Sequence, residues 1–234
     1  MNKDEFILEV KKLGIEVTEE KLNLLDRFYH MLVDWNEKIN LTAITEEKDV
    51  YLKHFYDSLT LCKEIDLSKE CRLCDVGSGA GFPGIVIKIF FPNVKITLID
   101  SLQKRVNYLL YVIRELNLKD IDAYHERMED YSKKHVEEFD YITARAVANL
   151  GIISEISVSA LKINGHLVFM KGNCEEELNK FLLKSSSLGL ELVNVNKFVL
   201  PLENSARTLI NLVKVSKTNK KYPRRVDVIK KEYM

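Results

Sequence analysis

A glycine-rich stretch at residues 75–84, Asp-Val-Gly-Ser-Gly-Ala-Gly-Phe-Pro-Gly, constrains the fold more than any other part of the chain. Residues 71–74 before it are short and half apolar, as in a buried strand, and residues 85–91 after it are apolar and end at Pro92. Pro83 suits the first turn of a helix, where its missing N–H needs no partner. Strand, glycine turn and helix in this order predict a ligand held against the free backbone N–H groups of a helix start.

Two nucleotide-binding patterns fit this turn. Residues 79–84 formally match the dinucleotide fingerprint G-x-G-x-x-G. An acid two residues before the first glycine, Asp75 before Gly77, instead matches the turn of S-adenosylmethionine-dependent methyltransferases. Residues 95–99 indicate a second strand, and it ends in Asp100, about twenty residues past the glycines, where an acid binds ribose hydroxyls. The structural alternatives are a tight turn without a ligand and a helix N-cap role for Asp100.

The charge of the chain is unevenly distributed. The 234 residues are 46% hydrophobic and 30% charged with a formal net charge of zero, which is ordinary for a globular domain with or without an extension. Residues 1–70 carry 10 basic and 16 acidic side chains, a net of −6, whereas residues 214–234 carry 8 basic and 2 acidic, a net of +6. The basic end predicts contact with an anionic polymer, and a solvated terminus is the alternative.

The sequence shows neither a secretory signal nor an apolar run that could span a membrane, so we expect a cytoplasmic protein. Its four cysteines are then expected to be thiols. Cys71-x-x-Cys74 lies in or beside a predicted strand and has no second ligand pair. We therefore expect neither a redox pair nor a metal site there.

The periodicity predicts three regions. Residues 1–66 form a helical N-terminal extension, with helices expected over 4–13 and over 46–62. Between them, apolar residues at helical spacing predict a further helix, which Thr18 can cap. Residues 67–216 alternate between predicted strands and predicted helices, and residues 217–234 form a basic C-terminal tail. The expected strands are 72–76, 95–99, 121–125, 139–143, 166–170, 190–200 and 207–215, and the expected helices are 84–91, 102–116, 149–162 and 174–187.

This alternation predicts a Rossmann-like α/β fold, with a seven-stranded, mostly parallel sheet and helices on both faces. Only a loop separates the last two strands. They therefore form a hairpin with an antiparallel strand, an ending typical of class I methyltransferases.

Several further motifs are spread over most of the chain in a fixed order. They are residues 40–44 (Asn-Leu-Thr-Ala-Ile), His54 with 57–59, the glycine turn, 100–101, 104–105, 144–148, 171–172 and 222–224. With this set the chain resembles the bacterial small-subunit ribosomal RNA methyltransferase G family, also called glucose-inhibited division protein B. After Tyr-Pro-Arg the family usually continues with glycine and proline. This chain instead has Arg225-Val226-Asp227-Val228, which leaves the placement of the last ten residues open.

The resemblance implies methyl transfer from S-adenosylmethionine to N7 of one guanine in 16S ribosomal RNA, within the small subunit or its precursor. The sequence leaves the oligomeric state open, with a monomer favoured. N7 carries a lone pair and no proton, so the reaction needs alignment rather than a general base. Residues 143–146 occupy the position where enzymes acting on exocyclic amines carry an Asn/Asp-Pro-Pro-aromatic motif. We name no certain catalytic residue, and Arg145 is a candidate for positioning substrate or cofactor.

The expected site residues fall into two sets. The cofactor set, in which Met128 and Glu129 match the family's adenine position, is Asp75, Gly77, Gly79, Gly81, Phe82, Asp100, Ser101, Leu102, Met128, Glu129 and Arg145. The set expected to neutralise RNA phosphates is Lys104, Arg105, Lys171, Lys220, Lys221, Arg224 and Arg225. His54, Asp57 and Ser58 stay without an assigned role.

Two other functions fit part of the sequence. An NAD(P)-dependent oxidoreductase would explain the glycine fingerprint, but it would need a second mononucleotide-binding half and a catalytic His or Tyr-Lys set, and we find neither. A non-enzymatic protein that binds S-adenosylmethionine or RNA stays open as an alternative, since N7 transfer requires no catalytic base.

Overall fold

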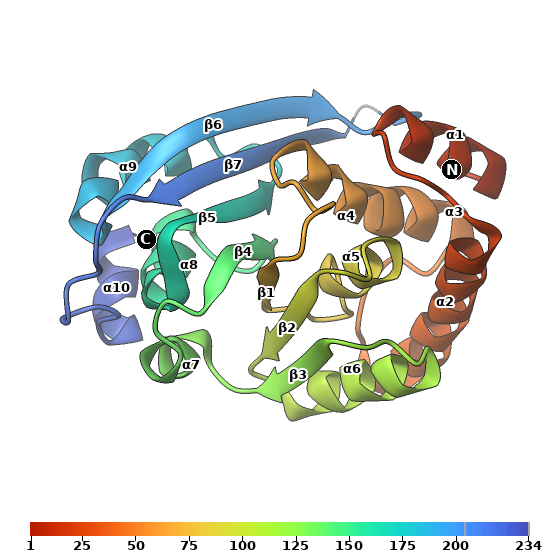
Figure 1. Cartoon of the computed structure of the whole chain (residues 1–234), viewed down its shortest axis with the longest axis horizontal. Coiled ribbons are helices and arrows are strands. Elements are labelled where there is room, and N and C mark those ends of the chain that lie inside the picture. Colours follow the sequence, from red (N-terminus) through yellow and green to blue (C-terminus); the bar gives the residue numbers. More distant parts are fainter. Residues whose placement is uncertain (204, 234) are drawn as a thin grey trace.

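One twisted sheet forms the centre of the molecule in the computed structural model, which describes residues 1–203 and 205–233 (Figure 1). In the described residues the strand order is β3-β2-β1-β4-β5-β7-β6. The strands are β1 (Arg72–Val76), β2 (Lys95–Asp100), β3 (Ile121–His125), β4 (Phe139–Arg145), β5 (Leu161–Lys171), β6 (Leu190–Val199) and β7 (Ala206–Lys214). The predicted seven-stranded, mostly parallel sheet is confirmed.

The direction of chain progression reverses between β1 and β4. Strands β1 to β5 pair in parallel, and β7 is antiparallel to both of its neighbours, β5 and β6, as the predicted hairpin requires. The chain moves outward from β1 to β3 and then crosses back to β4, which pairs with β1. Ligands of such sheets bind at this reversal, outside the carboxyl ends of the strands.

Helices cover both faces of the sheet, as expected. One face carries α5 (Gly84–Phe90), α6 (Gln103–Glu115) and the N-terminal extension, and the other carries α7 (Met128–Lys134), α8 (Leu150–Ser157), α9 (Glu175–Ser185) and α10 (Val226–Tyr233). Both faces of the central strands are therefore buried. Leu73 belongs to one apolar core and its neighbour Cys74 to the other, because successive side chains of a strand point to opposite faces. None of the helices described is both long enough and apolar enough to cross a membrane.

The N-terminal extension consists of helical segments, with Thr18 capping the second as predicted. They are α1 (Lys3–Lys12), α2 (Glu19–Ile39), α3 (Glu47–Val50), a π-helical stretch at Tyr51–Tyr56, α4 (Asp57–Leu59) and a 3-10 turn at Thr60–Lys63. Asn40 ends α2 in the left-handed conformation with φ 49°, which explains the break in the apolar stripe. The continuous helix expected over 46–62 is thus interrupted by a wider π-helical stretch, a feature frequent at functional sites.

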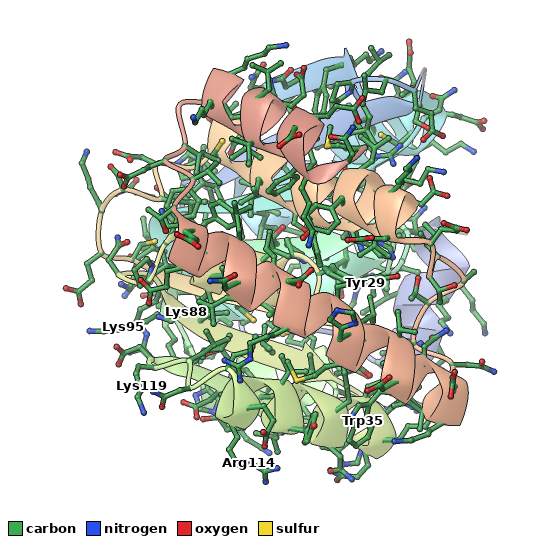
Figure 2. All side chains as sticks on the ribbon, turned by 90° about the vertical axis from the view of Figure 1, so that its right-hand side faces the viewer. Tyr29, Trp35, Lys88, Lys95, Arg114 and Lys119 are labelled. Atoms are coloured by element: carbon green, nitrogen blue, oxygen red, sulfur yellow. The ribbon has the colours of Figure 1, made fainter. Side chains whose placement is uncertain are left out.

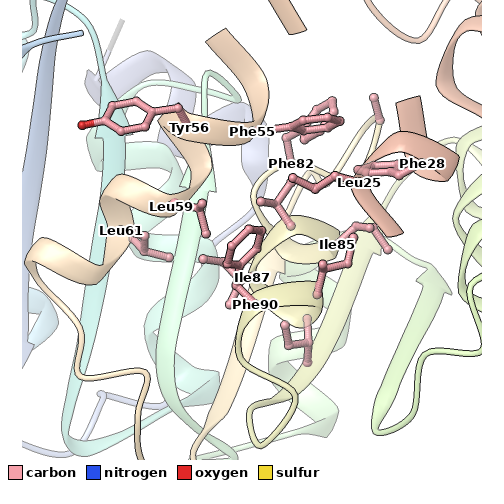
Figure 3. Close-up of a cluster of buried hydrophobic side chains, with 14 of the residues drawn as sticks. Leu25, Phe28, Phe55, Tyr56, Leu59, Leu61, Phe82, Ile85, Ile87 and Phe90 are labelled. Carbon is pink, nitrogen blue, oxygen red and sulfur yellow. The ribbon is translucent and has the colours of Figure 1, made fainter. Parts of the chain in front are cut away.

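Aromatic side chains attach this extension to the glycine turn. The Phe28 ring centroid lies 5.7 Å from that of Phe55 and 5.4 Å from that of Phe82, and Figure 3 shows these rings beside Ile85 of α5. Further along α2, which crosses this face in Figure 2, Trp35 contacts Tyr108 of α6 at 5.6 Å between centroids. Burial of these large side chains fixes the extension against the strand ends.

Two predicted boundaries are wrong. Residues 161–165 belong to β5 rather than to the end of a helix, and the helix expected over 149–162 gives way to a 3-10 turn at Val158–Ala160. The β4–β5 register shifts between Phe139 and Tyr141, where β5 carries extra residues and Asn164 adopts φ 64°. Asn-Gly is common at helix ends, but here it marks an irregularity inside a strand.

Candidate active site

The glycine turn presents bare backbone at the end of β1. Gly77 and Gly79 adopt φ values of 70° and 56°, which glycine tolerates better than any other residue. Apart from its chain neighbours, a Cβ on Gly79 would meet only the Gly77 carbonyl oxygen among the described residues, at 3.8 Å, so this backbone faces open space. A Cβ on Gly77 would lie 2.7 Å from Val147, and one on Gly81 would lie 2.6 Å from Ile85. Gly81 therefore serves the packing of the turn, whereas Gly79 is open to a ligand.

Asp75 leaves a buried oxygen without a partner. Its Oδ2 accepts a hydrogen bond from the Gly84 backbone N–H at 2.9 Å. Its Oδ1 is buried and has no hydrogen-bond partner among the described residues. Burial raises the pKa of Asp75 to about 7, although the Gly84 N–H lowers it. Such an unsatisfied acceptor is costly, and a cationic donor supplied by a ligand would satisfy it.

Asp100 ties the end of β2 to the glycine turn. Its Oδ2 accepts from the Gly79 N–H at 3.0 Å and its Oδ1 from the Leu102 N–H at 2.9 Å. Asp100 also lines a cavity of about 210 Å³, whose walls include Ser101, Met128 and Glu129. The structure thus brings together seven residues of the expected cofactor set, since Gly77 also lines this cavity and Gly79 and Leu102 donate to Asp100.

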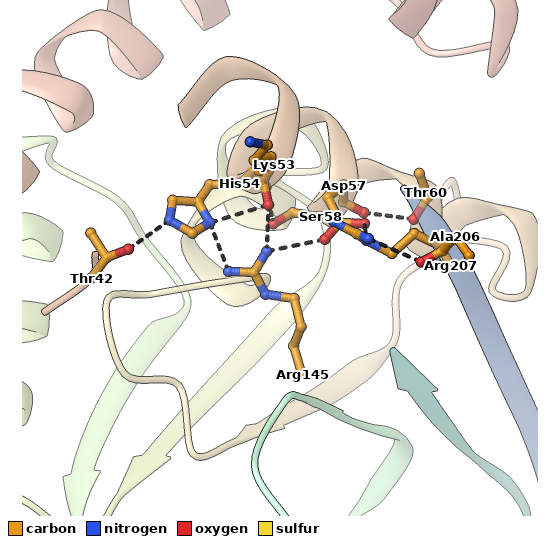
Figure 4. Close-up of polar contacts among 9 residues, drawn as sticks. All are labelled: Thr42, Lys53, His54, Asp57, Ser58, Thr60, Arg145, Ala206 and Arg207. Carbon is orange, nitrogen blue, oxygen red and sulfur yellow. Dashed lines mark hydrogen bonds and ion pairs between the residues drawn. The ribbon is translucent and has the colours of Figure 1, made fainter. Parts of the chain in front are cut away.

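Arg145 is held from three sides at the end of β4 (Figure 4). Its Nη1 donates to the Lys53 carbonyl oxygen at 2.9 Å and lies 3.3 Å from Asp57 Oδ2, while its Nη2 lies 3.1 Å from His54 Nδ1. The guanidinium also lies over the Phe82 ring, 5.1 Å from the centroid. Asp57 in turn accepts from Arg207 Nε of β7 at 3.0 Å. The extension, β4 and β7 therefore meet at one cluster.

His54 is neutral in this cluster. Its ring stacks on Phe82 with centroids 4.4 Å apart, and its Nε2 lies 2.9 Å from Thr42 Oγ1. Burial and then the charge of Arg145 lower the pKa of His54 to about 3. A neutral ring accepts at one nitrogen and donates at the other. Arg145 can only donate, so Nδ1 accepts from it and Nε2–H donates to Thr42. Nδ1 also lies 3.2 Å from the Lys53 carbonyl oxygen, which itself accepts from Arg145 Nη1.

Around this cluster lies a cationic cavity of about 440 Å³. Five basic side chains line it: Lys53, Arg105, Arg145, Lys171 and Arg207. The acid among the lining residues, Asp57, is paired with two of those arginines. The cavity is therefore suited to an anionic partner. Lys53 and Arg207 were missed in the sequence, because a lone lysine in a helix and a lone arginine in a strand carry no spacing signal.

The basic residues expected to bind RNA divide into three groups. Arg105 and Lys171 line the cationic cavity, and Lys104 is exposed one residue before Arg105 in α6. Lys220, Lys221 and Arg225 are exposed in the C-terminal segment. Arg224 differs, because it pairs with the fully buried Glu155 of α8. Tyr222, between Lys221 and Pro223, is buried.

Comparison with known proteins identifies the family. The profile of the rRNA small subunit methyltransferase G family, GidB, matches residues 21–221. This chain belongs to that family. The relative named ribosomal RNA small subunit methyltransferase G from Bacillus subtilis is 44% identical over 228 residues, covering 96% of this chain and 95% of the relative. The family member from Macrococcus caseolyticus is 43% identical over 234 residues, covering 99% and 98%. The chain is thus a methyltransferase, as the sequence motifs indicated.

Solved structures of more distant proteins share the fold. The precorrin-6y C5,15-methyltransferase of Geobacter metallireducens superposes with a TM-score of 0.53 at 14% identity, covering 76% of this chain and 92% of that one. The 16S rRNA (adenine(1408)-N(1))-methyltransferase of Catenulisporales acidiphilia gives a TM-score of 0.53 at 13% identity, covering 65% and 88%. These likenesses confirm the methyltransferase fold of this family member.

Proposed function

We propose that this protein transfers a methyl group from S-adenosylmethionine to N7 of a guanine in 16S ribosomal RNA of the small ribosomal subunit or its precursor. The observation that supports this most directly is the open backbone of Gly79, which donates to Asp100 beside the cavity of about 210 Å³. The preceding strand β1 contributes Asp75, whose buried Oδ1 has no partner among the described residues. The family name of the relatives supports the ribosomal RNA substrate. The proposed place of action is the cytoplasm, and the proposed active form is a monomer.

The residues present fit this cofactor. Asp75 would accept from its ammonium group, Asp100 would accept from the ribose hydroxyls, and the cavity beside Met128 would take the adenine. Arg145 would face the carboxylate of the methionine part or the substrate base. When bound, the cofactor supplies an electrophilic methyl group, and the protein aligns it with the nucleophile.

The cationic cavity favours an N7 nucleophile, because the side chains in it that could serve as a general base already bind arginine side chains. Asp57 is paired with Arg145 and Arg207, and His54 uses Nδ1 to accept from Arg145. Guanine N7 loses no proton on attack, so positioning is sufficient. The cationic side chains would bind the guanine O6 and the neighbouring phosphates while N7 stays free to react.

We propose that the RNA phosphates contact basic residues around this cavity, where Arg105 and Lys171 are half-buried, and exposed basic residues of α6 and of the C-terminal segment. These residues are Lys104, Arg105, Lys171, Lys220, Lys221 and Arg225. Arg224 leaves this set, because its guanidinium already satisfies Glu155. Lys220 lies with Glu137 and Ser159 near the amino ends of β4 and β5, whereas the cavity lies at the carboxyl ends of the strands. A single RNA that reaches both basic groups would therefore have to extend along the side of the molecule.

The test is transfer of a labelled methyl group from S-adenosylmethionine to small subunits that lack this modification. Label on N7 of one guanine of 16S ribosomal RNA is the expected result, and nucleotide mapping identifies the position. Label on an exocyclic amine, or none with a protein that still binds the cofactor, would contradict the proposal. Binding of NAD in preference to S-adenosylmethionine would support an oxidoreductase instead.

A further inference from the structure

The C-terminal segment is docked by a buried ion pair. Arg224 donates from Nε to Glu155 Oε1 at 2.8 Å and from Nη2 to Oε2 at 2.6 Å, and its backbone N–H donates to Oε1 at 3.0 Å. Glu155 is fully buried in α8. A buried carboxylate satisfied by three donors from one residue gives that residue a single position.

A second contact sets the position of α10 on α8, beside which it lies in Figure 1. The Tyr233 ring occupies the space over Gly151, since a Cβ on Gly151 would lie 2.2 Å from Tyr233 Cδ1. Ile229, between these anchors, is fully buried. Residues 224–233 are thus packed on the catalytic fold rather than free in solvent.

This docking brings α10 to the cavity that contains Asp100. Val226 and Lys230 line the same cavity of about 210 Å³ as Asp100 and Met128. Three isoleucines of α8, Ile152, Ile153 and Ile156, add apolar surface to it. Val228 and Lys231, on the same helix, are exposed and do not line the cavity.

We propose that α10 forms a wall of the subsite for the adenine base, so that Val226 and the aliphatic stem of Lys230 contact the cofactor. This inference rests on the proposed function, in which Asp100 binds the ribose next to that cavity. An adenine ring is flat and mostly apolar on its faces, and a cavity of such side chains excludes water from it. Lysine buries its stem along apolar surface and keeps its ammonium in water, so Lys230 suits the rim.

Two matched substitutions test this assignment in the full-length chain. Val226→Trp places a bulky ring at the cavity, and Val228→Trp places the same ring on the exposed side of α10. The binding of S-adenosylhomocysteine and of 5′-methylthioadenosine is measured by calorimetry, with Asp100→Ala as a positive control. We expect Val226→Trp to weaken both ligands by about tenfold or more, whereas Val228→Trp leaves both within about twofold. The loss should be similar for the two ligands, because 5′-methylthioadenosine carries the adenosine but lacks the amino acid part.

The other outcomes overturn the assignment. Equal affinities for the two tryptophan variants would remove α10 from the subsite. A loss for S-adenosylhomocysteine alone would place the effect at the methionine end. Melting temperatures of both variants, measured in parallel, show that the fold is retained. If the unsubstituted protein binds neither ligand, the proposed function itself fails, and that outcome is distinct from a difference between the variants.

Discussion

Arg145 Nη2 lies 3.1 Å from His54 Nδ1, although 91 residues of chain separate the two side chains. The imidazole can accept this hydrogen bond only while it is neutral. Arg145 therefore depends for its orientation on a helical segment outside the α/β part of the chain.

His54 should make the protein less stable in acid. Its pKa is about 3 when folded, against an ordinary value of 6.5. Above pH 6.5 neither state binds the proton. Below pH 6.5 His54 binds a proton in the unfolded state but not in the folded state. The free energy of unfolding therefore falls as the pH falls towards 3. Between pH 7.5 and 5.5 this contribution is about 1.4 kcal/mol.

Urea denaturation at these two pH values measures the loss. In His54→Asn, which keeps an acceptor for Arg145 and does not titrate, the loss should shrink by that amount. His30→Asn, a change at an exposed histidine of α2, is the control and should leave it unchanged. An identical pH dependence in His54→Asn and the parent would mean that His54 is not buried neutral.

Cofactor affinity should fall in acid because of Asp75. Its pKa is about 7 in the free protein, so below pH 7 a proton must leave before the carboxylate can accept from an ammonium group. The Kd of S-adenosylhomocysteine should rise by about tenfold per pH unit below 7. Calorimetry at pH 8, 7 and 6 tests this. Asp75→Asn should abolish the slope, and 5′-methylthioadenosine, which has no ammonium, should show none. A flat profile for S-adenosylhomocysteine would assign the ammonium to another group.

Gly79→Val should abolish cofactor binding in a folded protein. Any side chain there is strained at φ 56°, and this one would also project towards the ligand, since among the described residues, apart from the chain neighbours, only the Gly77 carbonyl oxygen lies within 4 Å of a Cβ. Gly14→Val is the matched control. Gly14 has φ 78° and no neighbour within 4 Å of a Cβ, but lies between α1 and α2. Both variants should lose about 1–3 kcal/mol of stability, and only Gly79→Val should lose binding. Binding by both variants would exclude a ligand at this backbone.

Arg224→Ala should destabilise the fold by about 3–5 kcal/mol, because it leaves the Glu155 carboxylate buried and unpaired. The double change Arg224→Met with Glu155→Met should recover most of this loss, since no charge remains to be satisfied. Arg225→Ala changes an exposed neighbour paired with Asp227 and should cost less than about 0.5 kcal/mol. Chemical denaturation compares the four proteins. Equal stability of the two single variants would show that the docking of the segment does not depend on this pair.

Replacing Lys220, Lys221 and Arg225 together with Ala should weaken RNA binding in a salt-dependent way. Each phosphate contact contributes about 0.7 to the log–log slope on single strands, so the slope should flatten by up to about 2. Cofactor affinity should stay within about twofold, because none of the three residues lines either cavity at the strand ends. The control is a variant in which three other basic residues are replaced with Ala, namely Lys95, Arg114 and Lys119, labelled in Figure 2. Its RNA affinity should show the same salt dependence as that of the parent. If both triple variants behave alike, the C-terminal segment makes no specific contact with RNA.

The sequence predicted the sheet well because its strands obey local rules. Residues 72–76 form a short, partly apolar run followed by glycines, and the structure places β1 at those residues. The end of β5 was predicted and its start was not. An Asn-Gly pair such as Asn164-Gly165 suits both the end of a helix and an irregularity within a strand. Only the pairing of β5 with β4 decides which of the two forms.

The site was only partly predictable for a related reason. A single β-α-β unit contains Asp75, Gly79 and Asp100. Because β1 and β2 are parallel neighbours, the order of these residues in the chain is enough to place them at the same end of the sheet. Arg207 meets Asp57 across 150 residues, and no local pattern reports such a contact. The Arg224–Glu155 pair was missed because a basic terminus has the same composition whether it is solvated or docked.

The position of β7 has a consequence for how the protein is made. β7 is near the end of the chain, yet it lies between β5 and β6, and it carries the arginine that pairs with Asp57. Until residues 206–214 leave the ribosome, the edge of β5 has no partner, and an exposed edge invites pairing with other chains. A product released before that point lacks both an inner strand and Arg207. Every chain terminated before residue 206 therefore keeps an unpaired edge on β5 and an incomplete site, and activity requires synthesis through β7.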